Sequence, residues 1–319
     1  MFISAYSYVS VNHIITSKHI LYLKNRSNYI EQNRVCSIFK NKDDNWTILT
    51  PIEQSIKNKI ETIGTPIKDW NLNINRGILT GYNDAFIIDE STKNKLIKED
   101  PKSAEIIRPI LRGKDIKKYS YEFKNLYLIN THNGNKSKNE KAIDVNEYPA
   151  IKGYLDKFYD KLIKRYDKGD TPYNLRNCIY MDDFYKQKII YSEIVQSPQF
   201  YLDSENYFPE ATTFIMTGDE LEILVACLNS RLYSYCFKKF YSGGGLGECG
   251  FRYKKAFLEK LPIPKFTDDS IKKQLKYLVN KINGQHLEDN ILNSLLDEID
   301  TILFNYALIN NEEKKVINN

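Results

Sequence analysis

The chain has no long apolar segment. No run of about 18 or more apolar residues occurs, so no part of the sequence is predicted to span a membrane. The first residues, MFISAYSYVSVNHII, lack a basic n-region and an unbroken apolar core, and they are therefore a poor signal peptide. Both absences favour a cytoplasmic protein.

Cysteine and histidine are scarce. The five cysteines are odd in number and include no CxxC pair, so free thiols in a reducing compartment are expected. The four histidines are scattered and do not have the spacing of a zinc site. Only His132, which lies in a polar loop, is a candidate for contact with a ligand.

Catalytic motifs are missing as well. A metal nuclease usually carries a Glu-x-Lys pair, but the residue two positions after Glu193 is Val195 rather than lysine. Residues Ser197 to Phe200 are similar to the SPPY-type motif of amino-methyltransferases, although Gln199 replaces the second proline. No glycine-rich strand–loop–helix start that could hold S-adenosylmethionine is found. Methyl transfer by this chain alone is therefore disfavoured.

A glycine-rich loop, GGGLGECG at residues 243–250, contains the formal dinucleotide fingerprint GxGxxG. It fails the context test, because it follows a predicted helix rather than a strand and has no βαβ unit around it. Glycines also allow backbone N–H groups to approach a phosphate closely. A turn, or a contact with a DNA backbone, is favoured over a nucleotide cofactor.

The composition is that of a globular protein. Of the 319 residues, 42% are hydrophobic and 27% are charged, and the net charge is +5. This charge is compatible with a nucleic-acid partner but does not establish one. The 24 tyrosines suit half-buried sheets and wet interfaces, and an A/T-rich gene would produce the same enrichment.

Apolar periodicity predicts both strands and helices. Strands are expected at Ala85–Ile88, Leu126–Ile129, Lys188–Val195, Phe200–Leu202 and Ala211–Met216. Helices are expected from Ser91 to Asp100, from Ser103 toward Pro109, over Pro149–Lys168 and from Asp219 through Phe240. The clearest helix start is at Thr50, where Thr50, Pro51 and Glu53 form a capping box.

These patterns divide the chain into three segments. Residues 1–49 alternate apolar and polar residues and are expected to form a strand-rich lead into the core. Residues 50–265 form the main domain. Residues 266–319 have a purely helical pattern, with a break between Asn280 and Glu288.

Basic and polar residues gather in several predicted loops. Arginine, asparagine and glutamine read base edges through paired hydrogen bonds, whereas lysine and backbone amides position a protein on phosphates. Ordinary surface polarity is the alternative explanation. The candidate DNA-binding residues are Arg112, Lys114, His132, Asn133, Lys136, Lys138, Arg176, Gln196, Gln199, Tyr201, Tyr241, Arg252 and Lys254.

Four blocks together resemble the C-terminal specificity domain of TaqI-type methyltransferases and of the fused type IIG restriction–modification enzymes. In order and spacing, the blocks are Gly77–Asp89, Ile107–Ile116, Leu175–Ile190, and Leu228–Arg231 followed by Leu261–Pro264. Each block is weak alone, and together they are specific.

The resemblance implies an α+β fold, a mixed α/β specificity domain with a curved sheet and flanking helices, followed by a helical tail. Family members couple such a domain to an N-terminal methyltransferase, often with a nuclease, and the domain reads duplex DNA mainly from the major groove. The implied partners are double-stranded DNA and a methyltransferase or endonuclease domain or subunit. No cofactor is expected for this chain, because S-adenosylmethionine and magnesium would belong to the catalytic region.

The leading hypothesis is a non-catalytic DNA target-recognition module of a restriction–modification system. It would be either a separate subunit or the C-terminal part of a longer enzyme. Two alternatives stay open: a methyltransferase or nuclease active on its own, and an interaction subunit that does not bind DNA. Under the leading hypothesis, Arg112→Ala or Arg252→Ala weakens DNA binding without unfolding the chain.

Overall fold

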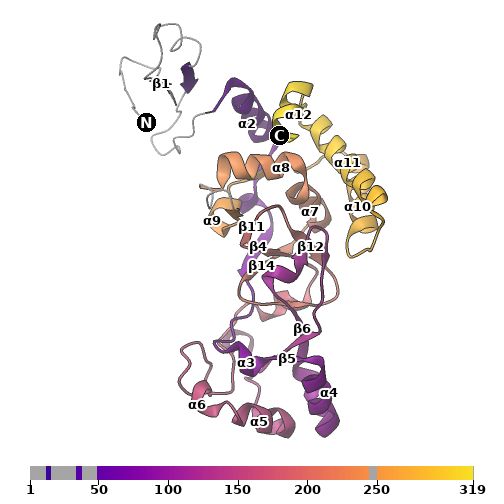
Figure 1. Ribbon diagram of the computed structural model, residues 1–319. Coiled ribbons are helices and arrows are strands. Elements are labelled where there is room, and N and C mark those ends of the chain that lie inside the picture. The colour runs from indigo at the N-terminus through magenta and orange to yellow at the C-terminus, as the bar shows by residue number, and fades with distance from the viewer. Residues whose placement is uncertain (1–11, 16–33, 38–48, 244–249, 319) are drawn as a thin grey trace, which may run out of the picture. The chain divides into compact units, whose positions relative to one another are not determined.

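The structure is a computed structural model that describes residues 12–15, 34–37, 49–243 and 250–318, without the side chains of residues 12–15, 34–37 and Lys136. The chain forms two compact units (Figure 1): Met1–Gly64 with Phe304–Asn319, and Thr65–Leu303. These units divide the chain differently from the three expected segments, because most of the helical tail belongs to the larger unit.

The smaller unit contains a strand pair ahead of its helices. Strands β1 (Asn12–Ile15) and β2 (Arg34–Ser37) pair antiparallel, with Asn12 opposite Ser37. The rest of the strand-rich lead expected over residues 1–49 lies outside the described residues, apart from Leu49.

Helix α2 (Pro51–Ile63) begins where the sequence predicts it. Thr50 Oγ1 accepts a hydrogen bond from the Glu53 backbone at 3.3 Å, and Glu53 Oε2 accepts one from the Thr50 backbone at 2.7 Å. This reciprocal pair is the capping box. Helix α12 packs on α2, and Glu313 of α12 forms an ion pair with Lys59 at 2.7 Å.

The larger unit is built around two four-stranded sheets among its described residues. The first has the order β12-β10-β14-β4, and all neighbouring strands are antiparallel. Its strands are β4 (Leu72–Arg76), β10 (Lys188–Ser192), β12 (Phe200–Asp203) and β14 (Thr213–Gly218). Helix α7 packs on β10 and β12, and α10 packs on α7.

The second sheet has the order β13-β6-β9-β5, with β13 parallel to β6 and the other pairs antiparallel. Its strands are β5 (Ile87–Asp89), β6 (Ile107–Leu111), β9 (Leu126–Ile129) and β13 (Phe208–Pro209). The two sheets share one buried core, because Ile190 and Ile215 of the first sheet pack with Leu128 and Phe208 of the second.

Three two-stranded pairs complete the strands of the larger unit. They are β3 (Thr65–Pro66) with β16 (Pro262–Ile263), β7 (Ile116–Lys117) with β8 (Ser120–Tyr121), and β11 (Ile194–Val195) with β15 (Phe251–Arg252).

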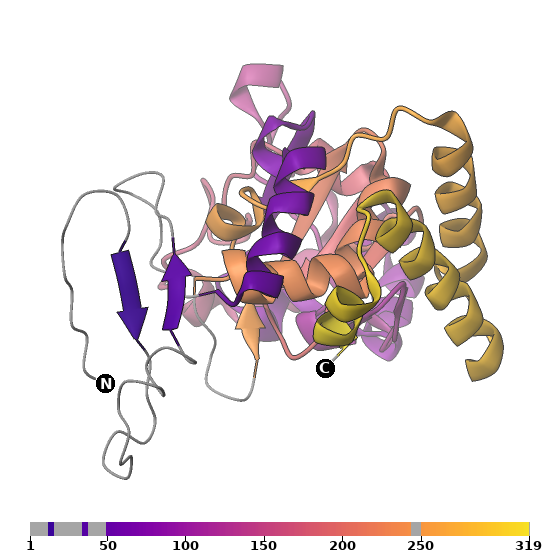
Figure 2. The same ribbon diagram turned by 90° about the horizontal axis from the view of Figure 1, so that it is seen from above.

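The α-helices beyond α2 are α3 (Asn83–Phe86), α4 (Glu90–Glu99), α5 (Pro149–Asp156), α6 (Tyr159–Leu162), α7 (Leu221–Asn229), α8 (Arg231–Cys236), α9 (Lys255–Leu258), α10 (Asp269–Ile282), α11 (Asp289–Tyr306) and α12 (Asn311–Asn318). Helices α10 and α11 lie side by side (Figure 2), and Gln274 donates a hydrogen bond to Glu298 between them at 3.0 Å. The helical tail, its expected break after α10 and the mixed α/β fold are confirmed.

The short 3-10 helices are η2 (Ile67–Asp69), η3 (Pro101–Ile106), η4 (Gly113–Asp115), η5 (Lys136–Lys138), η6 (Val145–Glu147) and η7 (Met181–Tyr185). A π-helical turn, η8 (Phe237–Tyr241), follows α8. No helix among the described residues is both long enough and apolar enough to cross a bilayer.

The helix predicted from Ser103 toward Pro109 is wrong. The segment forms η3 and then strand β6, in which Ile107 lies opposite Ile129 of β9. Consecutive β-branched residues favour the strand, and Pro109 cannot donate a helical hydrogen bond.

The single helix predicted over Pro149–Lys168 is interrupted. It breaks between α5 and α6, where Phe158 has the non-helical angles φ −110° and ψ 7°. The helical periodicity places Tyr166 on the inward face and Arg165 on the charged face, but Tyr166 is 97% exposed and Arg165 is 7% exposed. Arg165 donates hydrogen bonds to the backbone carbonyls of Thr80 and Asn174.

The long helix predicted from Asp219 through Phe240 is also interrupted. Ser230 is extended, with φ −73° and ψ 157°, and its Oγ accepts a hydrogen bond from the Tyr233 backbone at 3.2 Å. Serine therefore ends α7 and caps α8, because its hydroxyl competes with helical bonding and satisfies the first free N–H groups of a new helix.

A buried ion pair joins the edge strand β12 of the first sheet to its neighbour β10. Lys188 of β10 and Asp203 of β12 are both fully buried and hydrogen-bonded to each other. Asp203 also accepts from the Glu205 and Tyr207 backbones at 3.0 and 3.1 Å, and Lys188 donates to the Phe184 carbonyl at 2.7 Å. Burial raises the pKa of Asp203 and lowers that of Lys188, because desolvation outweighs their attraction.

Removing one member of this pair should destabilise the larger unit strongly. Asp203→Ala leaves the Lys188 charge buried without a partner and is expected to lower the free energy of unfolding by about 3–5 kcal/mol. Urea unfolding followed by circular dichroism measures the change. Lys152→Ala, which removes the exposed Lys152–Asp156 pair, is the matched control and should leave the midpoint unchanged. Equal midpoints for both variants would contradict this role of the buried pair.

Candidate nucleic-acid interface

Several predicted contact residues meet at the pair formed by β11 and β15. Ile194 lies opposite Arg252, Gln196 directly follows β11, and Lys254 lies two residues after the end of β15. Gln196 and Lys254 are exposed, and Gln199 is half-buried. We call Gln196, Gln199, Arg252 and Lys254 the ribbon cluster.

The amide groups of the ribbon cluster are available to a ligand. Within the described ranges, the side chains of Gln196 and Gln199 have no hydrogen-bond partner. Arg252 Nε is buried and also lacks a partner there. A glutamine amide carries a donor and an acceptor side by side, which is the pattern that pairs with the major-groove edge of adenine.

The turn η4 lies next to the ribbon cluster. A Cβ atom on Gly113 would come within 2.9 Å of Ser192 Oγ, and Ser192 is two residues from the start of β11. Lys114 on this turn is exposed. Lys117 donates to the Lys114 carbonyl at 3.1 Å. Glu122 pairs with Lys117 and with a further lysine, Lys124, at 3.7 and 2.9 Å.

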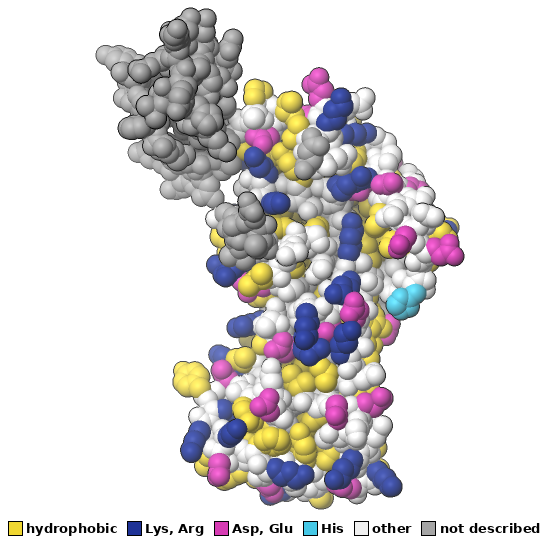
Figure 3. Space-filling view, in the orientation of Figure 1, with side chains coloured by type: hydrophobic (Ala, Val, Ile, Leu, Met, Phe, Trp, Pro, Cys, Tyr) yellow, Lys and Arg dark blue, Asp and Glu magenta, His cyan; other side chains and the backbone are white. Residues whose placement is uncertain are grey.

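These lysines border a shallow hollow of about 480 Å³. Its lining residues are Arg112, Lys114, Asp115, Glu122, Lys124 and Leu126. In Figure 3, Lys and Arg side chains gather at the height of β6, where the two sheets of the larger unit meet. Lys117 and Lys124 were missed by the sequence reasoning, because the β7–β8 turn that brings them beside Lys114 has no distinctive sequence signal.

Arg112 is engaged inside the protein. Its Nε and Nη2 donate to the two carboxylate oxygens of Asp115 at 2.9 and 3.1 Å, and Asp115 is 1% exposed. The Arg112 backbone also donates to Asp115 at 2.9 Å. This bidentate pair holds η4 in shape, so Arg112 acts on Lys114 through the turn.

The polar loop after β9 is also bonded internally. Asn133 is 8% exposed; it donates to Asp170 at 3.1 Å and accepts from the Asp170 backbone at 2.8 Å. His132 Nδ1 accepts from the Gly134 backbone at 3.1 Å. Burial lowers the pKa of His132, although Glu140 opposes this shift.

The remaining predicted residues are dispersed. Lys138 pairs with Asp182, and Arg176 pairs with Asp167 at 3.1 Å while its side chain stays 61% exposed. Tyr201 is 1% exposed in the shared core, so its ring faces no ligand. Tyr241 is half-buried in η8, with its ring 6.3 Å from that of Phe240. The side chain of Lys136 and residues 244–249 of the glycine loop lie outside the described residues.

Arg76, which was not among the predicted residues, connects η4 to the ribbon cluster. Arg76 ends β4 and is exposed, and its Nε donates to the Ala211 carbonyl at 2.6 Å. The next residue, Thr212, accepts a hydrogen bond from the Gly113 backbone at 3.4 Å. Ala211 and Thr212 therefore connect Arg76 to η4 and, through Ser192, to the ribbon cluster.

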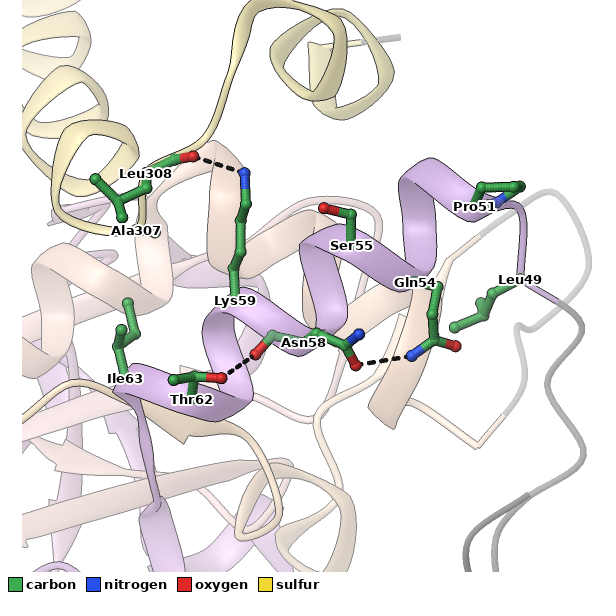
Figure 4. A pocket seen from close by; sticks show the side chains of 10 residues that line it. All are labelled: Leu49, Pro51, Gln54, Ser55, Asn58, Lys59, Thr62, Ile63, Ala307 and Leu308. Carbon is green, nitrogen blue, oxygen red and sulfur yellow. Dashed lines mark hydrogen bonds between the residues drawn. The ribbon is translucent and has the colours of Figure 1, made fainter. Parts of the chain in front are cut away.

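The smaller unit has a groove of different character. It has a volume of about 750 Å³ and is lined along α2 and by Ala307 and Leu308 (Figure 4). Lys59 donates to the Leu308 carbonyl at 2.7 Å, while the Leu308 side chain is 77% exposed. The lining is mainly apolar or uncharged, which does not match a phosphate backbone.

The described residues contain no group of three or more His, Cys, Asp or Glu side chains arranged to hold a metal ion. The thiols described are Cys178, Cys227 and Cys236, and all are free. Burial raises the pKa of each of them. Such thiols stay protonated at neutral pH and are poor nucleophiles.

Comparison with known proteins defines the class. Residues 108–263, just under half of the chain, match the family model of the TaqI-like C-terminal specificity domain. The matched range covers three of the four sequence blocks except for Ile107 and Pro264 at its two ends, and the block at Gly77–Asp89 precedes it. No curated protein matches the sequence.

Two restriction–modification enzymes of solved structure resemble the chain. The type IIL enzyme MmeI, solved in complex with DNA, gives a TM-score of 0.59 at 13% identity over 79% of this chain. The type IIG endonuclease BpuSI gives 0.49 at 16% identity over 80%. The aligned part is 35% of MmeI and 32% of BpuSI, so the chain spans about a third of each enzyme. At this identity the likeness to MmeI shows a shared fold.

Because Arg112 is paired with the buried Asp115, we expect its substitution to lower the stability of the protein. Arg112→Ala leaves the buried Asp115 carboxylate without its charged partner and is expected to lower the free energy of unfolding by about 2 kcal/mol. Lys114→Ala, on the same turn, removes only an exposed side chain and should leave stability unchanged. Thermal unfolding of both variants tests this difference. Unaltered stability in Arg112→Ala would show that the pair does not hold the turn.

Proposed function

We propose that this chain recognises a specific duplex DNA sequence for a methyltransferase, or a methyltransferase–endonuclease, of a restriction–modification system. The observation that carries the proposal is the specificity-domain match over residues 108–263, within which Gln196 and Gln199 have unpartnered amides. The catalytic region would be a partner subunit or another part of the same polypeptide. S-adenosylmethionine and magnesium would be bound there.

The proposed interface combines two kinds of contact. Gln196, Gln199 and Arg252 present groups that can read base edges in the major groove. Lys114 and Lys254 present ammonium groups that position the protein on phosphates. Arg76, the connecting residue, donates a hydrogen bond through Nε, and its Nη groups have no partner among the described residues.

Most predicted residues outside this surface have internal partners. Asn133 is fixed by Asp170, and Lys138 is paired with Asp182. We therefore centre the interface on the ribbon cluster and η4, and treat the loop after β9 as its support. The contacts then lie on the β11–β15 pair and η4. Regular elements of this kind position base-reading groups more precisely than loops do.

Binding of the chain to duplex DNA should weaken steeply with salt. Each lysine–phosphate contact releases counterions, so Lys114→Ala and Lys254→Ala should each reduce the slope of log affinity against log salt by about one. Fluorescence anisotropy with a labelled mixed-sequence duplex across a potassium chloride series measures this slope. Lys95→Ala is the matched control, because Lys95 is 70% exposed on α4, away from the proposed surface.

The same measurement separates the alternatives. No binding at low salt would contradict the proposal and favour an interaction subunit that does not bind DNA. Methylation or cleavage by the purified chain, with S-adenosylmethionine or magnesium supplied, would instead identify an enzyme active on its own. Equal salt slopes for the wild type and both lysine variants would place the phosphates elsewhere.

A further inference from the structure

A pocket lies between two segments of the larger unit that are about 100 residues apart in the sequence. Its walls are formed by Arg76–Leu79, which follow strand β4, and by Leu175–Met181, which precede η7. Its volume is about 240 Å³. This is somewhat below the roughly 300–1,000 Å³ of sites for drug-sized ligands, so it suits a small molecule. We call it the junction pocket.

The charged groups lining the junction pocket are both positive. They are Arg76 and Arg176, and its lining contains no carboxylate. Arg76 donates through Nε to the Ala211 carbonyl, and Arg176 donates through Nη1 to Asp167. Each guanidinium keeps further N–H donors for a ligand.

Two carboxylates close to the pocket each have a basic partner: Asp167 pairs with Arg176, and Asp183 pairs with Lys186. Asp183 is 7% exposed, and its carboxylate accepts from Asn75 Nδ2 at 3.1 Å and from Lys186 Nζ at 2.8 Å. It therefore does not cancel the positive charge at the mouth. The balance of charge in the junction pocket favours an anion.

Both guanidinium groups act on the same phenol. Burial raises the pKa of Tyr180, and the positive charges of Arg76 and Arg176 oppose that rise. Tyr180, Arg76 and Arg176 all line the pocket. Cys178, beside them, is half-buried, and burial raises the pKa of its thiol to about 11, so it adds no negative charge.

Part of the remaining wall is apolar and buried, while Asn177 and Ile179 line its exposed side. Ile78, Leu175 and Met181 are 4%, 1% and 6% exposed. The backbone leading into Leu175 is anchored by Arg165, which donates to the carbonyls of Pro172 and Asn174. The pocket is therefore preformed rather than dependent on a ligand for its shape.

We propose that the junction pocket binds a single nucleotide, with its phosphate between Arg76 and Arg176 and its base against Ile78, Leu175 and Met181. Planar guanidinium groups bind phosphate through paired hydrogen bonds. The Tyr180 ring offers a face on which a base stacks. The nucleotide is either a free deoxynucleoside monophosphate or an unpaired nucleotide of DNA. Only the second source rests on the proposed function.

Methionine methyl groups report directly on this pocket. Met181 lines it, whereas Met216 is fully buried in β14 and serves as an internal control. The full chain labelled with 13C-methyl methionine is titrated with each deoxynucleoside monophosphate, with the matching deoxynucleosides and with inorganic phosphate. Met181→Leu assigns the resonance.

The expected result is a saturable shift of Met181 with at least one monophosphate, while Met216 stays still. The deoxynucleoside without phosphate should bind about tenfold more weakly, because it lacks the charge-assisted bonds. No Met181 shift with any monophosphate would overturn the proposal. Inorganic phosphate binding as tightly as the nucleotides would overturn it too, since the apolar wall would then contribute nothing.

Variants locate the site. Arg176→Ala should weaken nucleotide binding about tenfold, because one of two phosphate partners is lost. Lys138→Ala is the matched control: it is an exposed basic residue paired with Asp182, as Arg176 is with Asp167, but it does not line the pocket. Equal loss in both variants would point to general electrostatic attraction and contradict a specific site.

Duplexes distinguish the two sources of the nucleotide. A duplex with a single-nucleotide bulge should move Met181, whereas the fully paired duplex should not, if the pocket takes an unpaired nucleotide of DNA. A Met181 shift with free monophosphates but no binding of any duplex would contradict the proposed function and support the junction pocket as a nucleotide site. Duplex binding without any Met181 shift by monophosphates or the bulge would reject the pocket alone.

Discussion

The buried pair of Lys188 and Asp203 is the interaction on which the proposed recognition surface depends. It joins β10 to the edge strand β12 of the first sheet, and both charges are removed from water. Desolvation costs several kcal/mol for each ion, so the pair is tolerated only because backbone groups complete its hydrogen bonding. Hydrophobic residues would hold two strands together equally well, but they would not fix which atoms of the strands meet.

That register carries through to the surface. Strand β10 ends at Ser192, against which Gly113 of η4 packs, and β11 begins two residues later. A shift of β10 by one residue would turn every side chain to the opposite face. It would also move Ser192 away from η4 and displace Gln196 from the end of β15. The positions of the Gln196 amide and of Lys114 on η4 therefore depend on the Lys188–Asp203 pair.

Internal pairing also decides which charges remain for a ligand. Arg112 is bound to Asp115, and Lys138 is bound to Asp182. Of the basic side chains behind the net charge of +5, these two are therefore less available to DNA. A domain that positions itself with a few lysines must draw its discrimination from groups that contact bases. Gln196 and Gln199 fit this requirement because their amides have no internal partner in the described chain.

Local features of the fold could be predicted from the sequence, whereas features that depend on distant residues could not. The capping box at Thr50 uses residues three positions apart, and the helical tail has a simple periodicity. Asn133 looked like a surface residue because its partner Asp170 is 37 residues away. Tyr201 and Arg165 were misjudged for the same reason, since burial depends on the packing of whole elements.

The same distinction between local and long-range features holds for the candidate site. The family could be identified from four short blocks, because these turns and strands shape the scaffold. The grouping of η4 with the ribbon cluster could not, because it arises through Ser192 and Thr212, which have no distinctive sequence signal. The junction pocket was hidden for a related reason: Arg76 and Arg176 meet only through the fold.

The central claim is that this chain reads a DNA sequence through the ribbon cluster. Selection of bound duplexes from a randomised library, followed by sequencing, tests it most directly, with the wild type compared to the Gln196→Ala/Gln199→Ala double variant. The account predicts one enriched motif for the wild type and loss of preference at specific positions of that motif for the variant. Enrichment of no motif by the wild type, or of an identical motif by both proteins, would contradict it.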